Sequence, residues 1–440
     1  MAGREEKQLQ SLKKWIEKWA PDIDSQLSVR LWNGDILPLG PNAKEDILFA
    51  INSPEAVRRL IFSPRLMTLF ELYAENLIDI EGGTPLEASY RWDHITILEY
   101  AKRLDKIDLI KSLWPFVTLS SGGGDKKGLS YDERISRRIE DGRNDMDLIS
   151  FHYDLSNEFY SLFLDPDMVY SCAYFATEEE PLESAQRAKL DLICKKLDLS
   201  PGEKLLDIGC GWGGLIIYAA ANYGVRAHGV TLSRRQYDFV TRRVEEEGLS
   251  ELVKVELKDY REIDMDGGYD KIVQIEMFEH LGIDNHDAHF EYIHSLLKPR
   301  GLYLHQASTR RATRDISSFR KETPYQKVIT RFIFPGGELD HIGMTLTNLE
   351  RFGFEVHDVE GMREHFKLTL ERWIERLWEK REEAANEIGW PKTRLWLLYL
   401  SLFCIAFDRG TVNVFQTLAS RREVGSSKLP LRRERMIPRP

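Results

Sequence analysis

Cysteine is scarce in this chain of 440 residues, which has only four, at positions 172, 194, 210 and 404. The four lie far apart and none belongs to a CxxC pair. The sequence therefore predicts neither a disulfide framework nor a zinc site, and we expect no bound metal. Isolated thiols of this kind suit the reducing cytoplasm, where we expect the protein to reside.

Long apolar runs are also missing. The longest, Leu395–Phe407, has 13 residues, whereas about 20 are needed to span a bilayer. We therefore expect a buried or lipid-facing helix there. The N-terminal run MAGREEKQLQSLKKW is charged and has no apolar core, so no signal peptide is expected.

Positive charge is not in excess, because 71 Asp and Glu outnumber 61 Lys and Arg and give a formal net charge of -10. This balance argues against a nucleic-acid partner, since attraction to phosphate needs a basic face. The C-terminus differs: residues 421–440 hold seven Lys and Arg against two Glu, a net charge of +5. A solvated tail is the default expectation, and contact with anionic lipid headgroups is the alternative.

Composition divides the chain into four parts. Residues 1–118 contain a hairpin signal around Asn33-Gly34 and two Ser-Pro helix starts, at Ser53 and Ser63, which predict a small α+β domain. Residues 119–147 include SSGGGDKK and predict a linker. Residues 148–422 form the largest predicted domain, and residues 423–440 form a basic tail.

Strand-like and helix-like patterns alternate from about residue 186 onward. The predicted strands are Lys204–Ile208, Ala227–Thr231, Val253–Leu257, Lys271–Ile275 and Gly301–Gln306. Five strands with helical crossovers predict an α/β fold with an open, doubly wound Rossmann-like sheet. Ligands of such sheets bind outside the carboxyl ends of the strands, so functional residues are expected just after each strand.

The stretch LLDIGCGWGG, residues 205–214, is the most informative in the chain. An apolar run ends at Asp207, and Gly209, Gly211 and Gly213 precede a helix-compatible run. Glycines let the backbone approach a ligand closely, and a helix N-terminus offers free N–H groups. Dinucleotides and S-adenosylmethionine both use such a turn. The departure from GxGxxG and the acid two residues before the first glycine favour S-adenosylmethionine.

The segment after the second predicted strand separates these two cofactors further. Dinucleotide enzymes and many methyltransferases place an acid there to bind the ribose, whereas this chain reads Val230-Thr231-Leu232-Ser233. The nearest polar candidates for the ribose or the amino-acid end are Thr231 and Gln236. The missing acid weakens the dinucleotide interpretation.

Two further groups of residues flank these motifs. Residues 151–175, FHYDLSNEFYSLFLDPDMVYSCAYF, are dense in aromatic side chains and could close over a ligand. EMFEH, residues 276–280, follows the fourth strand, and His305 ends the fifth. Each His or Glu alone is explained by structural hydrogen bonding, but together at successive strand ends they predict a site.

Six motifs in order resemble those of the cyclopropane-fatty-acyl-phospholipid synthase family, which includes the mycolic acid cyclopropane synthases. The resemblance covers about residues 150–410, and its motifs are HYDLSNEFYSLFLDPDMVYSCAYF (152–175), LLDIGCGWGG (205–214), GVTLS (229–233), EMFEHLG (276–282), LHQAS (304–308) and FIFPGGELD (332–340). It implies a class I methyltransferase sheet with helical lid elements in residues 148–422, and a lipid- or substrate-associated role for residues 1–118.

The resemblance also implies which residues bind S-adenosylmethionine. Glycines of the turn would pass beneath the cofactor, and polar and aromatic residues at strand ends would hold the rest. The expected cofactor-binding residues are Tyr170, Ser171, Asp207, Gly209, Gly211, Gly213, Thr231, Leu232, Gln236 and Tyr260.

The implied reaction is methylation of an alkene in a phospholipid acyl chain, followed by proton loss from the new methyl group and closure of a cyclopropane ring. The π bond attacks the sulfonium methyl without a base, but the proton must then be removed. In the family that base is thought to be bicarbonate, and the residues carried over to it are Glu279, His305 and Cys172. A carboxylate beside an anion requires a shared proton, and His305 would donate a hydrogen bond.

This chain departs from the family pattern at two positions. The tyrosine expected to contact bicarbonate is Phe366, and a position that is often isoleucine is Ala307. Losing one hydrogen bond to a charged group costs about 1.5–3 kcal/mol, which would weaken the anion site. Olefin methylation to a methylene- or methyl-branched chain is therefore an alternative, as is N-methylation of a small molecule.

Several partners follow from this interpretation. We expect phospholipid acyl chains at a membrane surface, with the protein peripheral at the inner membrane face. A homodimer is considered, and a branched product would require a reductase partner.

Overall fold

The computed structural model describes residues 2–23, 25–92, 111–117, 155–264, 267–315 and 319–432. The chain forms two compact units, each built from several segments. The first unit comprises Met1–Tyr131, Glu322–Ile333 and Leu377–Phe403, and the second comprises Asp132–Lys321, Phe334–Arg376 and Cys404–Pro440. Residues 322–333 and 377–403, which the sequence placed in the large domain, thus belong to the first unit. The predicted linker, residues 119–147, lies outside the described residues.

The first unit is an α+β module around a four-stranded sheet with the order β2-β1-β3-β4. Its strands are β1 (Ser28–Arg30), β2 (Ile36–Pro38), β3 (Leu48–Ile51) and β4 (Ile78–Glu81). Its helices are α1 (Ala2–Trp19), α2 (Pro54–Phe62), α3 (Leu66–Ala74), α4 (Pro85–Tyr90), α7 (Trp114–Val117), α16 (Pro324–Phe332), α19 (Arg381–Ile388) and most of α20 (Trp390–Asp408).

Of the three local structures predicted in this unit, two are confirmed. The Asn33-Gly34 hairpin is confirmed, because β1 and β2 pair antiparallel and Gly34 has φ 92°. Ser53 caps α2 by accepting from the Glu55 N–H, as expected. The third expectation was wrong: α3 begins at Leu66, after Arg65, so Ser63 does not cap it.

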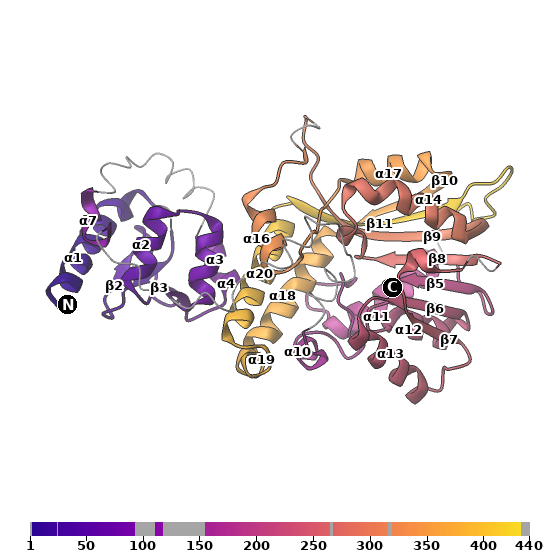
Figure 1. Ribbon diagram of the computed structural model, residues 1–440, viewed down its shortest axis with the longest axis horizontal. Helices are drawn as coiled ribbons and strands as arrows, with labels where there is room; N and C mark the ends of the chain where they lie inside the picture. Colours follow the sequence, from indigo (N-terminus) through magenta and orange to yellow (C-terminus); the bar gives the residue numbers. More distant parts are fainter. Residues whose placement is uncertain are drawn as a thin grey trace. The chain divides into compact units, whose positions relative to one another are not determined.

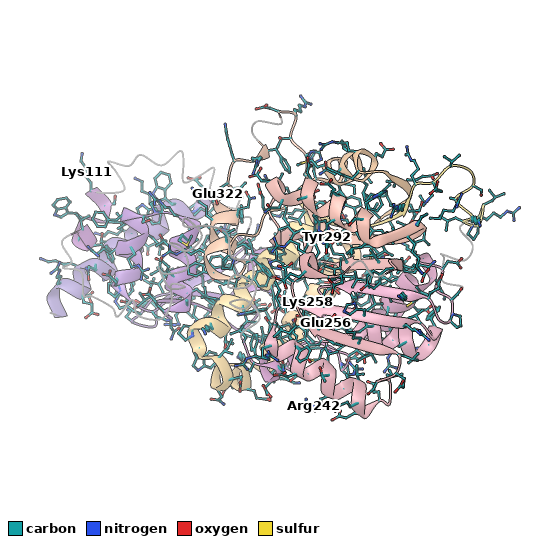
Figure 2. The ribbon with its side chains drawn as sticks, turned by 45° about the vertical axis from the view of Figure 1, so that its right-hand side comes forward. Lys111, Arg242, Glu256, Lys258, Tyr292 and Glu322 are labelled. Carbon is teal, nitrogen blue, oxygen red and sulfur yellow. The ribbon has the colours of Figure 1, made fainter. Side chains whose placement is uncertain are left out.

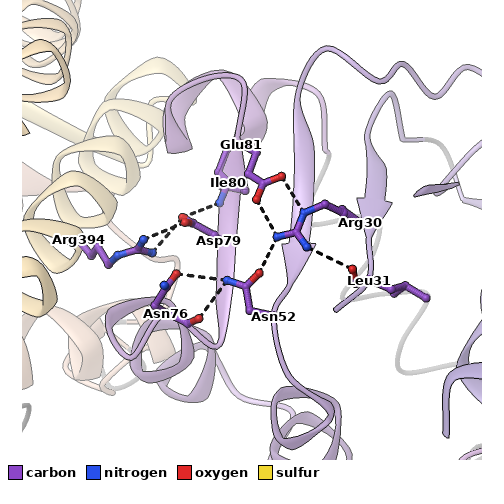
Figure 3. A network of polar contacts seen from close by, with 8 residues as sticks. All are labelled: Arg30, Leu31, Asn52, Asn76, Asp79, Ile80, Glu81 and Arg394. Atoms are coloured by element: carbon purple, nitrogen blue, oxygen red, sulfur yellow. Dashed lines mark hydrogen bonds and ion pairs between the residues drawn. The ribbon is translucent and has the colours of Figure 1, made fainter. Parts of the chain in front are cut away.

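A polar network fastens the later segments of this unit to its sheet (Figure 3). Arg394 of α20 donates to both carboxylate oxygens of Asp79 at 2.9 and 2.8 Å. Arg30 donates to both oxygens of Glu81 and, at 2.6 Å, to Asn52. The apolar stretch of α20 is largely buried, and no helix within the described ranges is long and apolar enough to cross a membrane.

The second unit contains a seven-stranded sheet with the order β10-β11-β9-β8-β5-β6-β7 (Figure 1). Its strands are β5 (Lys204–Ile208), β6 (Arg226–Thr231), β7 (Val253–Leu257), β8 (Tyr269–Ile275), β9 (Leu297–Arg310), β10 (Phe354–Gly361) and β11 (Val412–Arg421). Strands β5 to β9 are parallel, whereas β11 runs antiparallel to both β9 and β10.

Helices cover both faces of this sheet and bury a core on each (Figure 1). One core includes Leu205 of β5 and residues of α11 (Leu182–Lys196), α12 (Gly214–Tyr223) and α13 (Arg234–Glu246). The other includes Leu206 of β5 and residues of α14 (His286–Leu296) and α17 (Ile342–Arg351). Alternate residues of β5 thus face opposite cores, as expected for a buried parallel strand. Two further helices are α10 (Asn157–Ser161) and α18 (Arg363–Glu379). The last residues of α18 belong to the first unit.

The predicted α/β class and all five predicted strands are confirmed, although β9 extends well beyond its predicted bounds. The sequence missed β10 and β11, which make the sheet mixed rather than wholly parallel. Part of the basic tail is also held in place, because Arg300 donates to the carbonyls of Val424 and Ser426 at 2.8 and 3.1 Å.

Candidate active site

A cavity lies at the carboxyl ends of β5, β6, β7 and β8, where an open α/β sheet binds its ligand. Its walls come from the loop before α11, from the turns after these strands and from α11 itself. Lys258, labelled in Figure 2, directly follows β7 and lines it. The other lining residues that matter below are Tyr170, Ser171, Lys189, Asp207, Gly209, Gly211, Thr231, Leu232, Gln236, Tyr260 and Glu276.

The glycine turn adopts a backbone that only glycine tolerates well. Gly209, Gly211 and Gly213 have φ of 80°, 55° and 82°, in the left-handed region that costs other residues about 1–2 kcal/mol. A Cβ on Gly213 would lie 2.6 Å from Cγ1 of Val240, and one on Gly209 would lie 3.1 Å from the Met277 side chain. The turn therefore brings bare backbone against the cavity and starts α12.

Polar groups after β6 are arranged by the local chain. Ser233 caps α13 by accepting from the Gln236 N–H, and the Thr231 hydroxyl donates to Gln236 Oε1 at 2.8 Å. This bond holds the Gln236 side chain toward the strand end. All three side chains are buried, and Thr231 and Gln236 line the cavity.

Helix α11 holds the Val169–Ser171 backbone against the cavity. Gln186 donates through Nε2 to the carbonyls of Val169 and Ser171 at 3.2 and 2.8 Å. One turn later, Lys189 donates through Nζ to the Ser171 hydroxyl at 2.8 Å. Neither Gln186 nor Lys189 has any exposed surface.

Helix α18 and the residue before it, Met362, contact the next residues. The Ala173 N–H donates to Thr369 Oγ1 at 3.0 Å, the Phe175 N–H donates to His365 Nδ1 at 3.1 Å, and the Cys172 thiol is 3.8 Å from the carbonyl of Met362. Burial raises the pKa of this thiol well above its ordinary value, so Cys172 stays protonated and is a poor nucleophile.

Phe366 lies on the helix face that contacts this segment, one turn after Met362. Its amide donates to the Met362 carbonyl at 3.0 Å. Its ring packs 4.6 Å from that of Phe407, between centroids, and is 6% exposed. The hydroxyl expected from a tyrosine here is thus replaced by an apolar contact.

Glu276 follows β8 with an unusual backbone φ of 52°. Its Oε1 accepts from the Cys172 N–H at 3.0 Å and from Gln306 Nε2 at 2.6 Å. The chain of buried polar groups continues, because Gln416 donates to Gln306 at 2.8 Å and Lys196 donates to Gln416 at 2.9 Å. This chain fixes Glu276 and compensates the cost of its strained backbone.

Glu279 and His305 each present an atom without a hydrogen-bond partner in the described chain. Glu279 Oε1 accepts from the Ser308 N–H at 2.6 Å, but its Oε2 has no partner. Burial, and then the charge of Glu276, raise the pKa of Glu279 to about 8. Burial lowers the pKa of His305 to about 3, and its Nε2 has no partner. Both groups are therefore neutral at pH 7.

A hydrogen-bond chain leads from the cavity to His305. Tyr260 lies 2.9 Å from Nδ1 of His289, whose Nε2 lies 2.9 Å from Gln274 Oε1. Tyr303 donates to that same oxygen at 2.6 Å and lies 3.1 Å from Nδ1 of His305. With the Tyr303 hydrogen used in this way, Nδ1 of His305 is the donor and Nε2 carries a lone pair. Turning the Gln274 amide by 180° reverses this chain and makes Nε2 the donor expected from the sequence.

The structure brings most of the predicted residues together. Nine of the ten predicted cofactor-binding residues line the cavity, and the exception, Gly213, is the N-cap of α12 directly behind it. Cys172, Glu279 and His305 do not line it. Among the described residues, no hydrogen bond joins Cys172 to either of the other two, and its N–H donates to Glu276 instead. The roles of all these residues remain predictions.

Sequence reasoning missed Gln186, Lys189, Gln306 and Gln416. A spacing signal was available for the first two, because residues three apart on a helix share a face and both are polar within an otherwise apolar side of α11. Nothing local marks Gln416, which reaches the site only because β11 pairs with β9.

The residues around Glu279 fit a small anion that carries one proton. A neutral carboxyl offers one donor, and its unpartnered oxygen and the unpartnered His305 nitrogen are both buried. Buried polar atoms are normally satisfied, so each of these two atoms calls for a ligand or a water.

The sequence of the chain is similar to those of known proteins. The family model of mycolic acid cyclopropane synthetases matches residues 140–417. A probable fatty acid methyltransferase of Pseudomonas putida is 34% identical over 93% of this chain and 96% of its own length. The cyclopropane-fatty-acyl-phospholipid synthase of Escherichia coli K12 is 38% identical over 61% of this chain and 66% of its own length.

Solved structures agree with these sequence matches. The cyclopropane synthase MmaA2 of Mycobacterium tuberculosis superposes with a TM-score of 0.60 at 34% identity, covering 64% of this chain and 99% of that one. The mycolic acid cyclopropane synthase CmaA1, in a complex with S-adenosylhomocysteine, gives a TM-score of 0.60 at 33% identity with the same coverage. S-adenosylhomocysteine is what remains of S-adenosylmethionine after methyl transfer.

Proposed function

The chain belongs to the mycolic acid cyclopropane synthetase family and is an S-adenosylmethionine-dependent methyltransferase of the cyclopropane synthase type, and from this premise we propose that it converts a double bond in a phospholipid acyl chain into a cyclopropane ring. The observation that carries the proposal is the pair of neutral, buried groups, Glu279 and His305, each with one unpartnered atom. Methylation of an amine or a hydroxyl requires no such pair at this position.

The first step needs only placement of the two reactants. The alkene attacks the sulfonium methyl, the new carbon–carbon bond forms as the sulfur–methyl bond breaks, and the electron pair of that bond stays on sulfur. The glycine turn, Thr231, Gln236 and the Tyr170–Ser171 segment line the cavity and would hold the donor. Holding both partners in line supplies the main rate enhancement of such a step.

The second step removes one proton from the transferred methyl group as the ring closes. Glu279 cannot serve as that base, since it has a pKa of about 8 and carries a proton at pH 7. Bicarbonate bound between Glu279 and His305 would supply that base. The protonated Oε2 of Glu279 would donate a hydrogen bond to the anion without transferring its proton, and His305 would fix the anion's orientation through Nε2.

Olefin methylation that ends in a branched chain is the second candidate, and Phe366 favours it. Phenylalanine lacks the hydroxyl that a tyrosine would offer as a hydrogen-bond donor in the region of Cys172, and its ring packs against Phe407 instead. A weaker base site leaves the carbocation longer, and proton loss from a neighbouring carbon then gives a methylene branch. A reductase partner would be needed to reach a methyl branch.

The setting of the reaction is part of the proposal. A phospholipid substrate requires contact with a membrane surface, which we place at the inner face, with a homodimer as the proposed assembly. The positive charge in the tail, a net +5 over residues 421–440, is suited to anionic headgroups.

Expression in cells that make monounsaturated lipids tests the proposal. Fatty acids are released and analysed by mass spectrometry before and after mild hydrogenation. A new species heavier by one methylene that resists hydrogenation supports the ring. A species of the same mass that gains two hydrogens supports the branched product instead. Absence of both species, with methyl transfer to amines, would reject a lipid substrate.

A further inference from the structure

Three charged side chains gather at one end of the cofactor cavity. Lys189 and Asp207 are 0% and 3% exposed, and Glu276 is partly buried beside them. Burial of isolated charges is costly unless opposite charges or a ligand compensate them. One cation and two carboxylates in a small space complement a zwitterion, such as the α-amino and α-carboxyl groups of an amino acid.

The order of strands shows which end of the cofactor meets these charges. Along the sheet the neighbours run β8, β5, β6 and β7. Glu276 follows β8 and Asp207 lies in β5, whereas Thr231 ends β6 and Tyr260 follows β7. With the ribose and adenine at Thr231 and Tyr260, an extended cofactor places its amino-acid end over β5 and β8. Lys189 and Ser171 line the cavity at that end.

The bond between Lys189 and Ser171 has a fixed direction. An ammonium group can only donate, so the Ser171 hydroxyl oxygen accepts from Lys189 at 2.8 Å. The serine's own hydrogen is then free to donate elsewhere, and no residue in the described chain accepts it. Two N–H bonds of Lys189 are likewise left without an acceptor among the described side chains. A ligand at this point meets donors only.

We propose that Lys189 is a positioning residue that, together with Ser171, fixes the carboxylate of the cofactor's amino-acid end. Lys189 orients the Ser171 hydroxyl as a donor and adds its own positive charge. The ammonium of the same amino-acid end faces Asp207 and the open oxygen of Glu276, whose Oε1 accepts both of its hydrogen bonds. Burial lowers the pKa of Lys189, but the neighbouring carboxylates, Glu276 foremost, favour its charged form.

The alternative is that Lys189 only packs the Val169–Ser171 segment, as Gln186 does from the preceding turn of α11. The two roles differ in what they recognise. A packing residue affects every ligand of the cavity equally, whereas a carboxylate-binding pair affects only ligands that carry the carboxylate.

Calorimetric titration of the full chain with two ligands separates these roles. The ligands are S-adenosylhomocysteine and its decarboxylated analogue, which keeps the adenine, ribose, sulfur and ammonium. For Lys189→Met we expect at least a tenfold loss of affinity for S-adenosylhomocysteine and a change below twofold for the analogue. Equal losses for both ligands, or no loss for either, would overturn the proposal.

Two further variants guard against a trivial result. Ser171→Ala removes only a hydroxyl, so it tests the proposal even where Lys189→Met does not fold, and it must show the same selective loss. Gln186→Met disturbs the same segment without touching the charge, and it should weaken both ligands alike. A selective loss in Gln186→Met would attribute the effect to segment position and overturn the proposal. Since no lipid enters the titration, its outcome is independent of the proposed acyl substrate.

Discussion

The cofactor cavity and the Glu279–His305 region lie at the same edge of one sheet but are built differently. The cavity is formed by turns after four strands, and its charges come in both signs. In the Glu279–His305 region, burial holds both titratable groups neutral. The first region is thus prepared for a charged, extended ligand, and the second for a small group that brings its own charge.

This difference teaches where chemistry and affinity separate in the molecule. Residues predicted to hold the methyl donor sit in short contiguous motifs, so changes there should alter binding. Residues proposed to govern proton loss come from β9, α18 and the turn after β8, so changes there should alter turnover or product while cofactor binding stays intact. Variants in which cofactor affinity and turnover change independently would support this separation, and variants in which both change together would contradict it.

The largest effect is expected from Glu279→Gln. An amide can donate a hydrogen bond to the anion but cannot exchange a proton with it, so turnover should fall about 100-fold or more. Affinity for S-adenosylhomocysteine should stay within about twofold, because Glu279 does not line the cavity. Steady-state kinetics and calorimetry measure the two quantities, with the exposed Glu291→Gln as the matched control. Near-normal turnover would remove Glu279 from the mechanism.

The glycine turn offers the converse experiment. Gly213→Ala combines φ 82° with a contact of 2.6 Å to Val240, whereas Gly211→Ala has φ 55° and open space around its new Cβ. We expect a loss of about 2–3 kcal/mol in the free energy of unfolding for Gly213→Ala and about 1 kcal/mol for Gly211→Ala. Denaturant unfolding without cofactor measures both. Equal losses would show that the Val240 side chain shifts and relieves the contact with the new Cβ of residue 213.

The neutrality of the Glu279 region predicts a pH dependence of stability. Burial raises the pKa of Glu279 to about 8, against 4.5 for the ordinary group, so between these values the folded chain keeps a proton that the unfolded chain has lost. The contribution of Glu279 to stability must therefore fall as pH rises from about 5 to 8. Asp207 and Asp340, each with a pKa raised to about 7, act in the same direction.

Unfolding of the Glu279→Gln variant at these two pH values isolates the contribution of Glu279. The wild-type decline should exceed that of the variant by about 2 kcal/mol, allowing for the open side of the residue. Glu291→Gln should decline as the wild type does. Parallel curves for Glu279→Gln and wild type would mean that Glu279 ionises normally in the folded chain.

The smallest effect is expected from Phe366→Tyr. A hydroxyl on this face of α18 would restore one donor beside Cys172, and we expect the apparent affinity for bicarbonate to rise about threefold. Turnover measured in bicarbonate-depleted buffer with graded additions detects this change. Unchanged kinetics would place residue 366 outside the anion site and remove the main argument for a branched product.

The parallel half of the sheet and the glycine turn were predictable because their signals are local. The run around Asp207 contains strand, turn and helix start within ten residues, and each of the five predicted strands has its own apolar pattern. Strand β11 was not predictable in the same way. Its residues, VNVFQTLASR, mix polar and apolar types, and the buried Gln416 among them bonds to Lys196 and Gln306 inside the unit.

The site was predictable only as far as single motifs reach. Tyr170, Thr231 and Tyr260 could be placed because each stands at a strand end or in a distinctive loop. The support for Glu276 could not, because it passes through Gln306 to Gln416, which is 110 positions away along the chain. Such a contact is set by strand order, and strand order is not written in any local pattern.

Strand β11 has a consequence for the order in which the protein is made. It is the last strand of the described chain, yet it lies between β9 and β10. Until residues 412–421 leave the ribosome, β9 keeps an open edge beside His305 and Gln306, and open edges of this kind pair with other chains. Glu276 cannot be locked before then either. A nascent chain that already holds every residue of the cofactor cavity therefore still lacks the Gln416 support of Glu276, and the edge of β9 stays exposed until β11 pairs with it.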